Sequence, residues 1–216
     1  MFVKNRMTSN PYTISPDATI ADALELMRKN NVRRLPVVKN GELVGIITER
    51  EILEVSPSKA TTLSIFELNY LLSKTKVSAV MTKDVITISP DTLLEEAAVL
   101  MRDNRVGALP VLENNKLVGI ITETNIFDAF IDLLGFREPG TRIAVEVDDT
   151  PGILADVASV IKNYGANITH LVVYRSSPGK SVIVIRVNTP NTDDIVNTLE
   201  KQNYKVTSVL KNDGAH

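Results

Sequence analysis

The amino-acid sequence predicts a mixed fold that combines an α/β part with an α+β part, and three observations predict it. The run LVGIITE occurs twice, at residues 43–49 and 117–123. The sequence around this run matches itself at an offset of 74 residues without a gap. After Gly135 the order of apolar and turn-forming residues changes. We therefore expect two copies of one unit, related by a pseudo-twofold axis, and then an unrelated domain.

The repeat extends well beyond the heptapeptide, and about half of the aligned positions are identical. The matches pair Met7-Thr8 with Met81-Thr82, residues 13–17 with 87–91, Met27-Arg28 with Met101-Arg102, and residues 35–37 with 109–111. Because the two units are so similar, any site on one of them should have a related counterpart on the other.

Each unit is predicted to begin with a short strand and a helix. In the first unit the strand at Thr13-Ile14 ends at Ser15-Pro16-Asp17, and Asp17 is predicted near the N-cap of the helix. Apolar residues then recur at i, i+3, i+4 and i+7, as on one face of a helix. These residues are Ile20, Ala23, Leu24 and Met27 in the first unit, and Leu94, Ala97, Ala98 and Met101 in the second.

The rest of each unit is predicted to be a hairpin and a second helix, giving the order β-α-β-β-α. In the first unit the β-rich runs 35–38 and 43–47 are joined by a turn that contains Asn40-Gly41, a strong hairpin signal. Asn114-Asn115 takes this place in the second unit and also tolerates positive φ. Thr48 is predicted to open the second helix.

A helical connector is predicted over residues 55–80, between units at 1–54 and 81–135. Ser56-Pro57 ends the preceding helix. Ser64-x-x-Glu67 is a capping-box pattern in front of Leu68, Leu71 and Leu72. This helix could either pack on the two units or associate with a partner or a second copy, and the sequence leaves both uses open.

The last domain, predicted over 140–212, follows a boundary at Pro139-Gly140. Strands are predicted at 142–147, 168–175, 181–187 and 206–210. A loop at 176–180 joins the second and third strands. The first helix carries an apolar stripe of Leu154, Val157, Ala158 and Ile161 and ends at Gly165. The second helix contains Ile195, Val196 and Leu199. The order β-α-β-β-α-β is the ferredoxin-like pattern.

Composition excludes several classes of function. The formal net charge is -2, which gives no indication of nucleic-acid binding. No cysteine is present, so disulfides and thiolate chemistry are excluded. The chain shows no secretory signal and no run of about 20 apolar residues that could span a bilayer, so we expect a cytoplasmic protein without membrane contact. The two histidines, His170 and His216, have no metal-site spacing, and no catalytic motif occurs.

The most informative polar residues follow the repeated heptapeptide. Thr48 and Thr122 lie at helix starts, where free N–H groups favour an anion such as phosphate. One turn later come Glu51 and Asn125. A carboxylate there could accept hydrogen bonds from a ribose diol, and an amide could accept at its oxygen. The same pattern also arises from helix capping alone, and this alternative stays open.

The two units resemble CBS motifs in their ISPD strand ends, in RRLPVV and GALPVL, and in GIIT before a helix. The resemblance implies a pair whose cleft binds an adenosyl ligand. In that family an Asp follows the Thr by three residues, whereas this chain has Glu51, which keeps the charge, and Asn125, which does not. The implied ligand contacts are Thr13, Ile14, Arg34, Pro36, Thr48 and Glu51 in the first unit, and Thr87, Ile88, Pro110, Thr122 and Asn125 in the second.

Arg33-Arg34 in the first unit corresponds to Gly107-Ala108 in the second. In the CBS family these positions can reach phosphates, and solvated surface charge is the alternative. Since alternate residues of a strand face opposite sides, we expect at most one arginine, Arg34, to face a cleft directly. The two sites should therefore be unequal, with the first better suited to a charged nucleotide.

The last domain resembles an ACT domain in DDTPGILADVASVI and YGANITHLVV. The resemblance implies a small-molecule site at the turn before the first helix, with Asp149, Gly152, Ile153, Leu154 and Asn167 as contacts, and an amino acid as ligand. Gly152 permits close backbone approach, and the helix start suits a carboxylate. Turn formation and dimerisation alone would explain the same residues.

Two CBS motifs followed by one ACT domain resemble the acetoin-utilisation proteins of the AcuB type. This resemblance implies a non-enzymatic sensor that needs no cofactor, forms a homodimer and regulates an unidentified protein. Its candidate ligands are AMP, ADP, ATP, S-adenosylmethionine and cyclic di-AMP. The alternatives are a structural or interaction protein with vestigial clefts and, third, an enzyme that acts on a small molecule.

Overall fold

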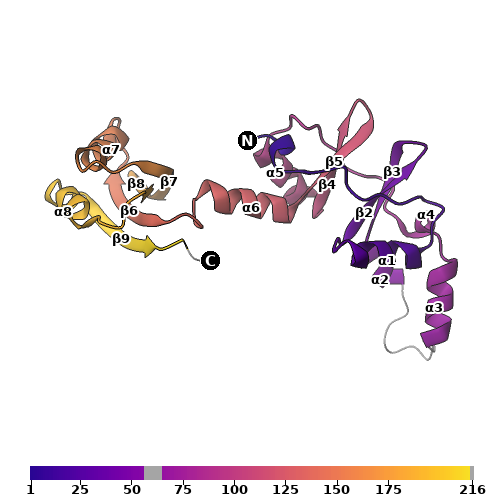
Figure 1. The fold of residues 1–216 in the computed structure, drawn as a ribbon. Helices are drawn as coiled ribbons and strands as arrows, with labels where there is room; N and C mark the ends of the chain where they lie inside the picture. Colours follow the sequence, from indigo (N-terminus) through magenta and orange to yellow (C-terminus); the bar gives the residue numbers. More distant parts are fainter. Residues whose placement is uncertain (56–64, 215–216) are drawn as a thin grey trace. The chain divides into compact units, whose positions relative to one another are not determined.

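The computed structural model describes residues 1–55 and 65–214, without the side chains of residues 65, 66, 68 and 69. The chain divides into two compact units, Met1–Ile126 and Phe127–His216. Figure 1 shows their helices and strands. Ser56-Pro57, Ser64 and His216, which carried predictions above, lie outside the described residues. No helix of the described chain is both long and apolar enough to cross a bilayer.

The first unit confirms the repeated order of elements. It contains η1 (Val3–Asn5), β1 (Thr8–Ser9), α1 (Ile20–Lys29), β2 (Arg34–Lys39), β3 (Glu42–Thr48), α2 (Glu49–Val55), α3 (Ile65–Lys74), α4 (Val77–Val80), α5 (Leu94–Asn104), β4 (Ala108–Glu113), β5 (Lys116–Thr122) and the first residues of α6 (Glu123–Leu133), which continues into the second unit. The predicted first strand of each repeat is reduced to one bridging residue. Ile14 pairs in parallel with Val37, and Ile88 pairs with Val111.

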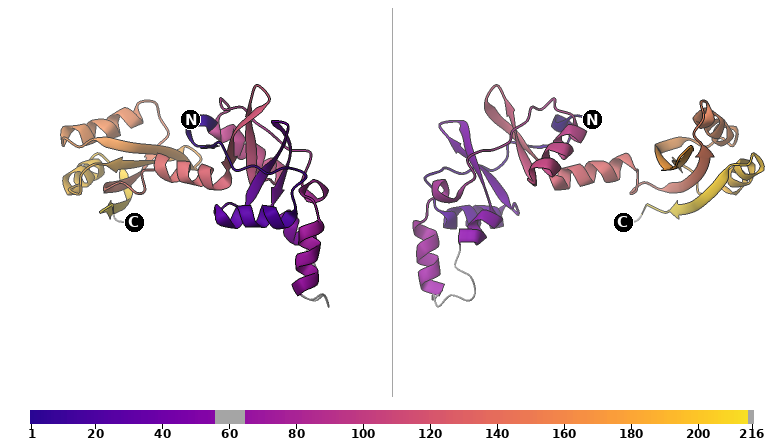
Figure 2. Two further views of the ribbon diagram at one scale, coloured as in Figure 1. Left: turned by 45° about the vertical axis from the view of Figure 1, so that its right-hand side comes forward. Right: turned by 180° about the vertical axis from the view of Figure 1, so that it is seen from behind.

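The hairpins β2–β3 and β4–β5 form as the turn residues predict, and they lie side by side in Figures 1 and 2. Asn40 and Gly41 have φ of 54° and 86°, and Asn114 and Asn115 have φ of 50° and 61°. Positive φ at both central residues is the requirement of a type I′ turn, which matches the twist of the strands it joins.

The cap of the first long helix differs from the prediction. Thr19, not Asp17, caps α1, because the Thr19 hydroxyl accepts from the Asp22 N–H while the Asp22 carboxylate accepts from the Thr19 N–H. This reciprocal capping box holds the pKa of Asp22 below its usual range, chiefly through the side-chain hydrogen bond to Thr19. Asp17 lies before the helix, 3.7 Å from the Lys76 ammonium.

The two repeats exchange their leading segments. The Val3 N–H donates to the Thr92 carbonyl, and the Val77 N–H donates to the Ala18 carbonyl, which is the same bond one repeat later. In the same way β1 pairs with β5, while Thr82 bridges to Ile46 of β3. Each repeat is therefore completed by the residues that precede the other repeat.

The glycine of each heptapeptide is where the exchanged segment approaches. A Cβ atom on Gly45 would lie 2.9 Å from the Thr82 carbonyl oxygen, and one on Gly119 would lie 3.1 Å from the Thr8 carbonyl oxygen. Neither glycine has positive φ, so the close approach, not the backbone conformation, requires it.

The core of the first repeat lies between its two helices and the hairpin. Its buried residues are Ile14, Ile20, Ala23, Met27, Leu35, Val37, Ile47, Ile52 and Val77. The described part of the connector contains the helices α3 and α4, separated by Thr75 and Lys76. Leu72 of α3 packs against this core, whereas Leu71 is 44% exposed.

The second unit is a four-stranded antiparallel sheet of order β7-β8-β6-β9, as the ferredoxin-like pattern predicts. After the end of α6 it contains β6 (Gly140–Asp148), α7 (Ile153–Asn163), β7 (Ile168–Ser177), β8 (Lys180–Val187), α8 (Asp193–Lys201) and β9 (Lys205–Asn212). The helices α7 and α8 supply Val157, Val160, Ile161, Ile195 and Leu199 to a core shared with one face of the sheet.

Two details of this unit correct the predictions. Leu154 is 41% exposed, and α7 instead buries Val157, Val160 and Ile161 and packs Ile153 against the core. Both sets of residues satisfy helical spacing, and packing against the sheet selects the second. The loop between β7 and β8 has only two residues, Pro178 and Gly179, because both strands extend further than predicted.

Candidate functional site

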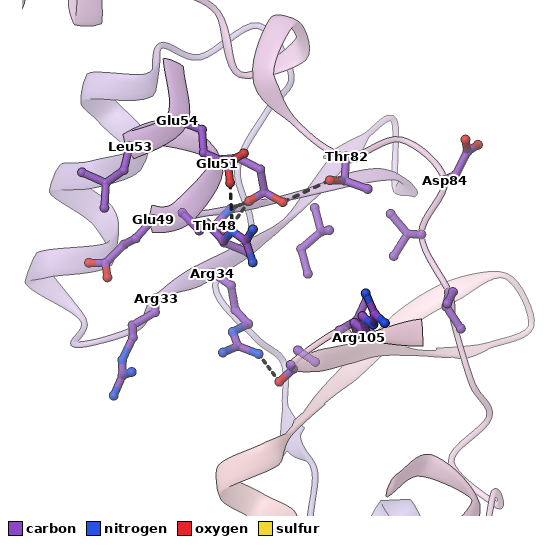
Figure 3. Close-up of a pocket in the computed structure, with 17 residues that line it drawn as sticks. Arg33, Arg34, Thr48, Glu49, Glu51, Leu53, Glu54, Thr82, Asp84 and Arg105 are labelled. Carbon is purple, nitrogen blue, oxygen red and sulfur yellow. Dashed lines mark hydrogen bonds and ion pairs between the residues drawn. The ribbon is translucent and has the colours of Figure 1, made fainter. Parts of the chain in front are cut away.

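A cavity of about 870 Å³ lies between the two repeats of the first unit. It is lined by Arg33, Arg34, Ile46, Thr48, Glu49, Arg50, Glu51, Leu53, Glu54, Thr82, Asp84, Val85, Ile86, Arg105, Val106, Gly107 and Ala108. Figure 3 shows these side chains. The first repeat supplies the β3–α2 junction and the start of β2. The second repeat supplies its exchanged leading segment and the start of β4.

The β3–α2 junction presents Thr48 and Glu51 to this cavity, already bonded to each other. The Glu51 carboxylate accepts from the Thr48 N–H at 2.7 Å and from the Thr48 hydroxyl. It also accepts from the Thr82 hydroxyl at 3.1 Å, which links it to the other repeat. Figure 3 shows all three interactions. A carboxylate has about four acceptor positions, so a ribose diol would have to compete with these donors.

The equivalent junction of the second repeat is a complete capping box. The Asn125 side-chain oxygen accepts from the Thr122 N–H at 2.9 Å and from the Thr122 hydroxyl at 2.8 Å. The Asn125 N–H donates back to the Thr122 hydroxyl at 3.3 Å. Neither residue lines the cavity. The two copies therefore share their capping geometry but differ in what they face.

Arg34 lies across the interface between the repeats. Its guanidinium donates to the Gly107 carbonyl oxygen, an interaction drawn in Figure 3. The side chain is half-buried. Burial lowers the pKa of Arg34, and Arg33 acts in the same direction, while the carboxylates of Glu123 and Glu51 oppose the shift. Arg33 and Arg34 both line the cavity, although the sequence predicted that at most one of them, Arg34, would face a cleft directly.

Gly107 leaves the space that Arg34 occupies. A Cβ atom on Gly107 would lie 3.1 Å from Arg34 Nη1 and 3.1 Å from Glu123 Oε2. Gly107 stands where the first repeat has Arg33. The divergence between Arg33-Arg34 and Gly107-Ala108 is therefore complementary, because the small residues of one repeat accommodate the large residue of the other.

Charged groups of both signs surround the cavity. Arg50 forms an ion pair with Glu54 at 2.9 Å. Within the described residues, Arg33 and Arg105 have no ion pair with a carboxylate, so their charges are available to an anion. Arg105 adopts φ of 56° at the end of α5, a left-handed conformation that is uncommon outside glycine.

Sequence reasoning missed most of the second repeat's contribution to the lining. It did not identify Arg105, Thr82 or the segment 84–86. The alignment of the two repeats does not distinguish these residues from their neighbours, because they reach the cavity only through the exchange of leading segments. Of the eleven residues proposed from the sequence, Arg34, Thr48 and Glu51 line the cavity.

The other proposed CBS residues lie elsewhere in the first unit. Thr13 and Thr87 are exposed, while Ile14, Pro36, Ile88 and Pro110 are buried. The buried residues connect the first extended residues of each repeat to its own hairpin, since the Ile14 N–H donates to the Pro36 carbonyl and the Ile88 N–H to the Pro110 carbonyl.

Four of the proposed ACT residues, Asp149, Gly152, Ile153 and Leu154, lie around the start of α7, outside the cavities described for this chain. Asn167 does not join them, because it precedes Ile168, which pairs with Val187 at the other end of the sheet from Asp148 and Lys180. Gly152 is the N-cap at φ of 90°, and a Cβ there would meet no atom within 4 Å. The Asp149 carboxylate lies 3.7 Å from Arg175 Nε. The Asn167 N–H donates to the Asn188 side chain at 2.9 Å, and Asn167 itself is exposed.

Comparison with known proteins gives the family. The CBS domain model matches residues 3–58 and 77–132, and the ACT domain model matches residues 141–203. The two CBS matches are themselves 74 residues apart and begin at Val3 and Val77, the first residues of the exchanged helices η1 and α4.

Three solved structures resemble the CBS pair. AcuB from Vibrio cholerae is 32% identical with a TM-score of 0.53, over 64% of this chain and 96% of that one. CBSX2, solved with AMP, is 30% identical with a TM-score of 0.51, over 61% and 97%. The CBS pair of MJ0100, solved with 5′-methylthioadenosine and S-adenosyl-L-methionine, is 27% identical with a TM-score of 0.50, over 60% and 95%. The chain belongs to the CBS-domain proteins, and it carries a tandem CBS pair followed by an ACT domain.

Proposed function

We propose that this protein is a non-enzymatic sensor that binds one adenine nucleotide or related adenosyl ligand in the cavity between its CBS repeats. The observation that carries the proposal is the cavity itself, at about 870 Å³, with Thr48 and Glu51 on one side and Arg34 and Arg105 on others. This volume lies within the range of ligand pockets. Two similar CBS pairs were solved with AMP and with S-adenosyl-L-methionine, which supports an adenosyl ligand here.

The charges around the cavity favour a phosphate-bearing ligand over a neutral nucleoside. Arg33 and Arg105 have no carboxylate partner among the described residues, and guanidinium groups recognise phosphate through paired hydrogen bonds. We therefore propose AMP, ADP or ATP as the first class to test, followed by S-adenosylmethionine and cyclic di-AMP. Binding would regulate a partner protein by favouring one arrangement of a homodimer. The ACT domain would bind an amino acid or hold that dimer. We place the protein in the cytoplasm.

Isothermal titration of the full chain against these five ligands tests the proposal. We expect one of them to bind with one molecule per chain. If none binds, the sensor function is wrong. Incubation of the purified protein with acetoin tests the enzymatic alternative, and turnover without a second protein would contradict a sensor that has no catalytic role.

A second candidate function, a scaffold with vestigial clefts, rests on a specific observation. The Glu51 carboxylate is already bonded to Thr48 and Thr82, and Asn125 is bonded to Thr122. These bonds stabilise the fold without any ligand. Under this alternative the natural chain would bind none of the five ligands, whereas the double variant Glu51→Asp/Asn125→Asp, which restores the family's aspartates, would bind one.

A further inference from the structure

The open face of the ACT sheet contains a cavity that the proposed function does not use. It has a volume of about 270 Å³ and is lined by Leu134, Phe136, Arg142, His170, Leu171, Val172, Tyr174, Val184 and Arg186. The core helices cover the other face of the sheet, where Ile143 and Ile185 are buried. Since neighbouring residues of a strand point to opposite faces, Arg142 and Arg186 belong to the face without helices.

Three cationic or titratable residues form one row across this face. Arg186 of β8 is directly opposite Arg142 of β6 and directly opposite His170 of β7. Like charges at opposed positions of a sheet destabilise it. The two arginines are always charged, so this row is an unfavourable arrangement unless an anion compensates it.

Arg186 forms no ion pair with a carboxylate within the described residues. It is only 5% exposed, yet its guanidinium reaches only the carbonyl oxygens of Leu134 at 3.3 Å and Glu138 at 3.4 Å. Burial and the neighbouring Arg142 both lower the pKa of Arg186, and the Glu138 carboxylate partly opposes them. Two long bonds satisfy only part of the five N–H donors of a guanidinium.

Arg142 is also without a carboxylate partner in the described chain. Its guanidinium donates to the Ser208 hydroxyl at 3.0 Å. The nearby carboxylate of Glu138 is 54% exposed and lies 3.7 Å from His170 Nδ1. The described lining therefore contains two guanidinium groups and no carboxylate, so the cavity carries a net positive charge.

The segment 134–138 passes over this row and is bonded to β9. Asn212 of β9 donates to the carbonyl oxygens of Phe136 at 2.6 Å and Glu138 at 3.1 Å. At Gly135, with φ of 61°, a Cβ atom would overlap the His170 ring, so the chain passes directly over the imidazole. Leu134 and Phe136 supply apolar surface beside the arginines.

We propose that this cavity binds a small carboxylic acid that has an apolar group and no α-amino group. Arg142 and Arg186 would hold the carboxylate, and Phe136 and Tyr174 would contact the apolar part. An ammonium group would be disfavoured, because the lining is already positively charged and the Glu138 carboxylate is half-exposed and beside His170. The site is separate from the turn at residues 149–154, where an amino acid is proposed to bind.

Titration of the full chain with phenylacetate, phenylacetamide and phenylalanine tests this proposal, with calorimetry as the readout. We expect phenylacetate to bind at millimolar or lower concentration and at least about tenfold more tightly than the other two, because charge-assisted bonds to guanidinium are the strong ones. Arg142→Gln should lower the affinity for phenylacetate about tenfold. Lys162→Gln, which removes the same charge from an exposed position on α7, should leave the affinity for phenylacetate unchanged.

Three results would overturn the proposal: no binding of phenylacetate, equal binding of phenylacetamide, or a loss in Asp149→Ala that Arg142→Gln does not share. The last result would move the site to the α7 turn. AMP titrated into the same samples reports on the CBS cavity independently. Failure of this proposal is therefore distinguishable from failure of the proposed function.

Discussion

The Arg34 guanidinium of the first CBS repeat donates a hydrogen bond to the Gly107 carbonyl oxygen of the second. These residues stand one position out of register in the repeat, since Arg34 aligns with Ala108 and Gly107 with Arg33. The symmetric counterpart would join residue 108 to the Arg33 carbonyl, and it does not form because Ala108 has no side-chain donor. The bond between Arg34 and Gly107 makes the arginine pair of the first repeat part of the interface between the repeats, and it breaks the pseudo-twofold symmetry at the edge of the ligand cavity.

Removal of this bond should destabilise the protein. Arg34→Ala leaves the Gly107 carbonyl without its charged donor, and we expect a loss of about 1–3 kcal/mol in the free energy of unfolding. Urea denaturation of the full chain measures it. Arg33→Ala is the matched control and should change the value by no more than about 0.5 kcal/mol, because Arg33 is exposed. Equal effects of the two substitutions would contradict a role for Arg34 at the interface.

Gly107→Ala should be tolerated better once Arg34 is gone. In the natural chain the added Cβ would lie 3.1 Å from Arg34 Nη1, which is tight, and we expect a cost of about 1 kcal/mol. In the Arg34→Ala background that neighbour is absent, so the cost should fall. The double-mutant cycle measured by urea denaturation should show a coupling of at least about 0.5 kcal/mol. Additivity would mean that Glu123 or the backbone, not Arg34, sets the requirement for glycine.

The order of elements and the turns could be predicted from the sequence because they depend on local features. Helical spacing predicted α1 and α5, and Asn40-Gly41 predicted the first hairpin turn. Asp17 was predicted near the N-cap, and the cap itself is Thr19, two residues later, since only Thr19 has Asp22 three residues after it. The sequence identifies an N-cap only when the cap residue and the residue three positions later are considered together.

The exchange of leading segments could not be predicted in this way. The bond between Val3 and Thr92 joins residues that are distant in the chain, and neither residue type indicates its partner. The lining of the cavity could not be predicted for the same reason, because the exchange of leading segments brings Thr82 and Ile86 to it. The buried face of α7 was also misassigned, since Leu154 and Ile153 fit helical spacing equally well and packing on the sheet decides between them.

Gly45→Ala should weaken the attachment of the exchanged segment that precedes the second repeat. The new Cβ would lie 2.9 Å from the Thr82 carbonyl oxygen, and backbone cannot move aside as a flexible side chain can. We expect a loss of about 1–3 kcal/mol in urea denaturation. Gly119→Ala is the matched control from the other repeat and should cost less, because its nearest carbonyl, that of Thr8, lies at 3.1 Å. A larger loss in Gly119→Ala would contradict this ranking.

If the cavity binds a nucleotide as proposed, Arg34→Ala should lower its affinity for charged ligands but not for neutral ones. A phosphate interacts with a guanidinium through charge-assisted bonds, whereas adenosine has no group that requires one. We expect AMP affinity to fall about tenfold and adenosine affinity to stay the same, as measured by isothermal titration. Equal losses for the two ligands would reject direct phosphate contact and would instead indicate that Arg34 acts only by holding the repeats together.

The two repeats should contribute unequally to nucleotide binding. Glu51 lines the cavity and Asn125 does not, although both accept hydrogen bonds from the threonine three residues earlier. Glu51→Ala removes the only carboxylate of the pair, and we expect AMP affinity to fall at least about tenfold. Asn125→Ala removes an equivalent capping contact, so it controls for loss of stability. It should leave AMP affinity nearly unchanged at one molecule per chain. Two molecules per chain, or a larger loss in Asn125→Ala, would show that the second repeat holds a competent site and that the asymmetry lies elsewhere.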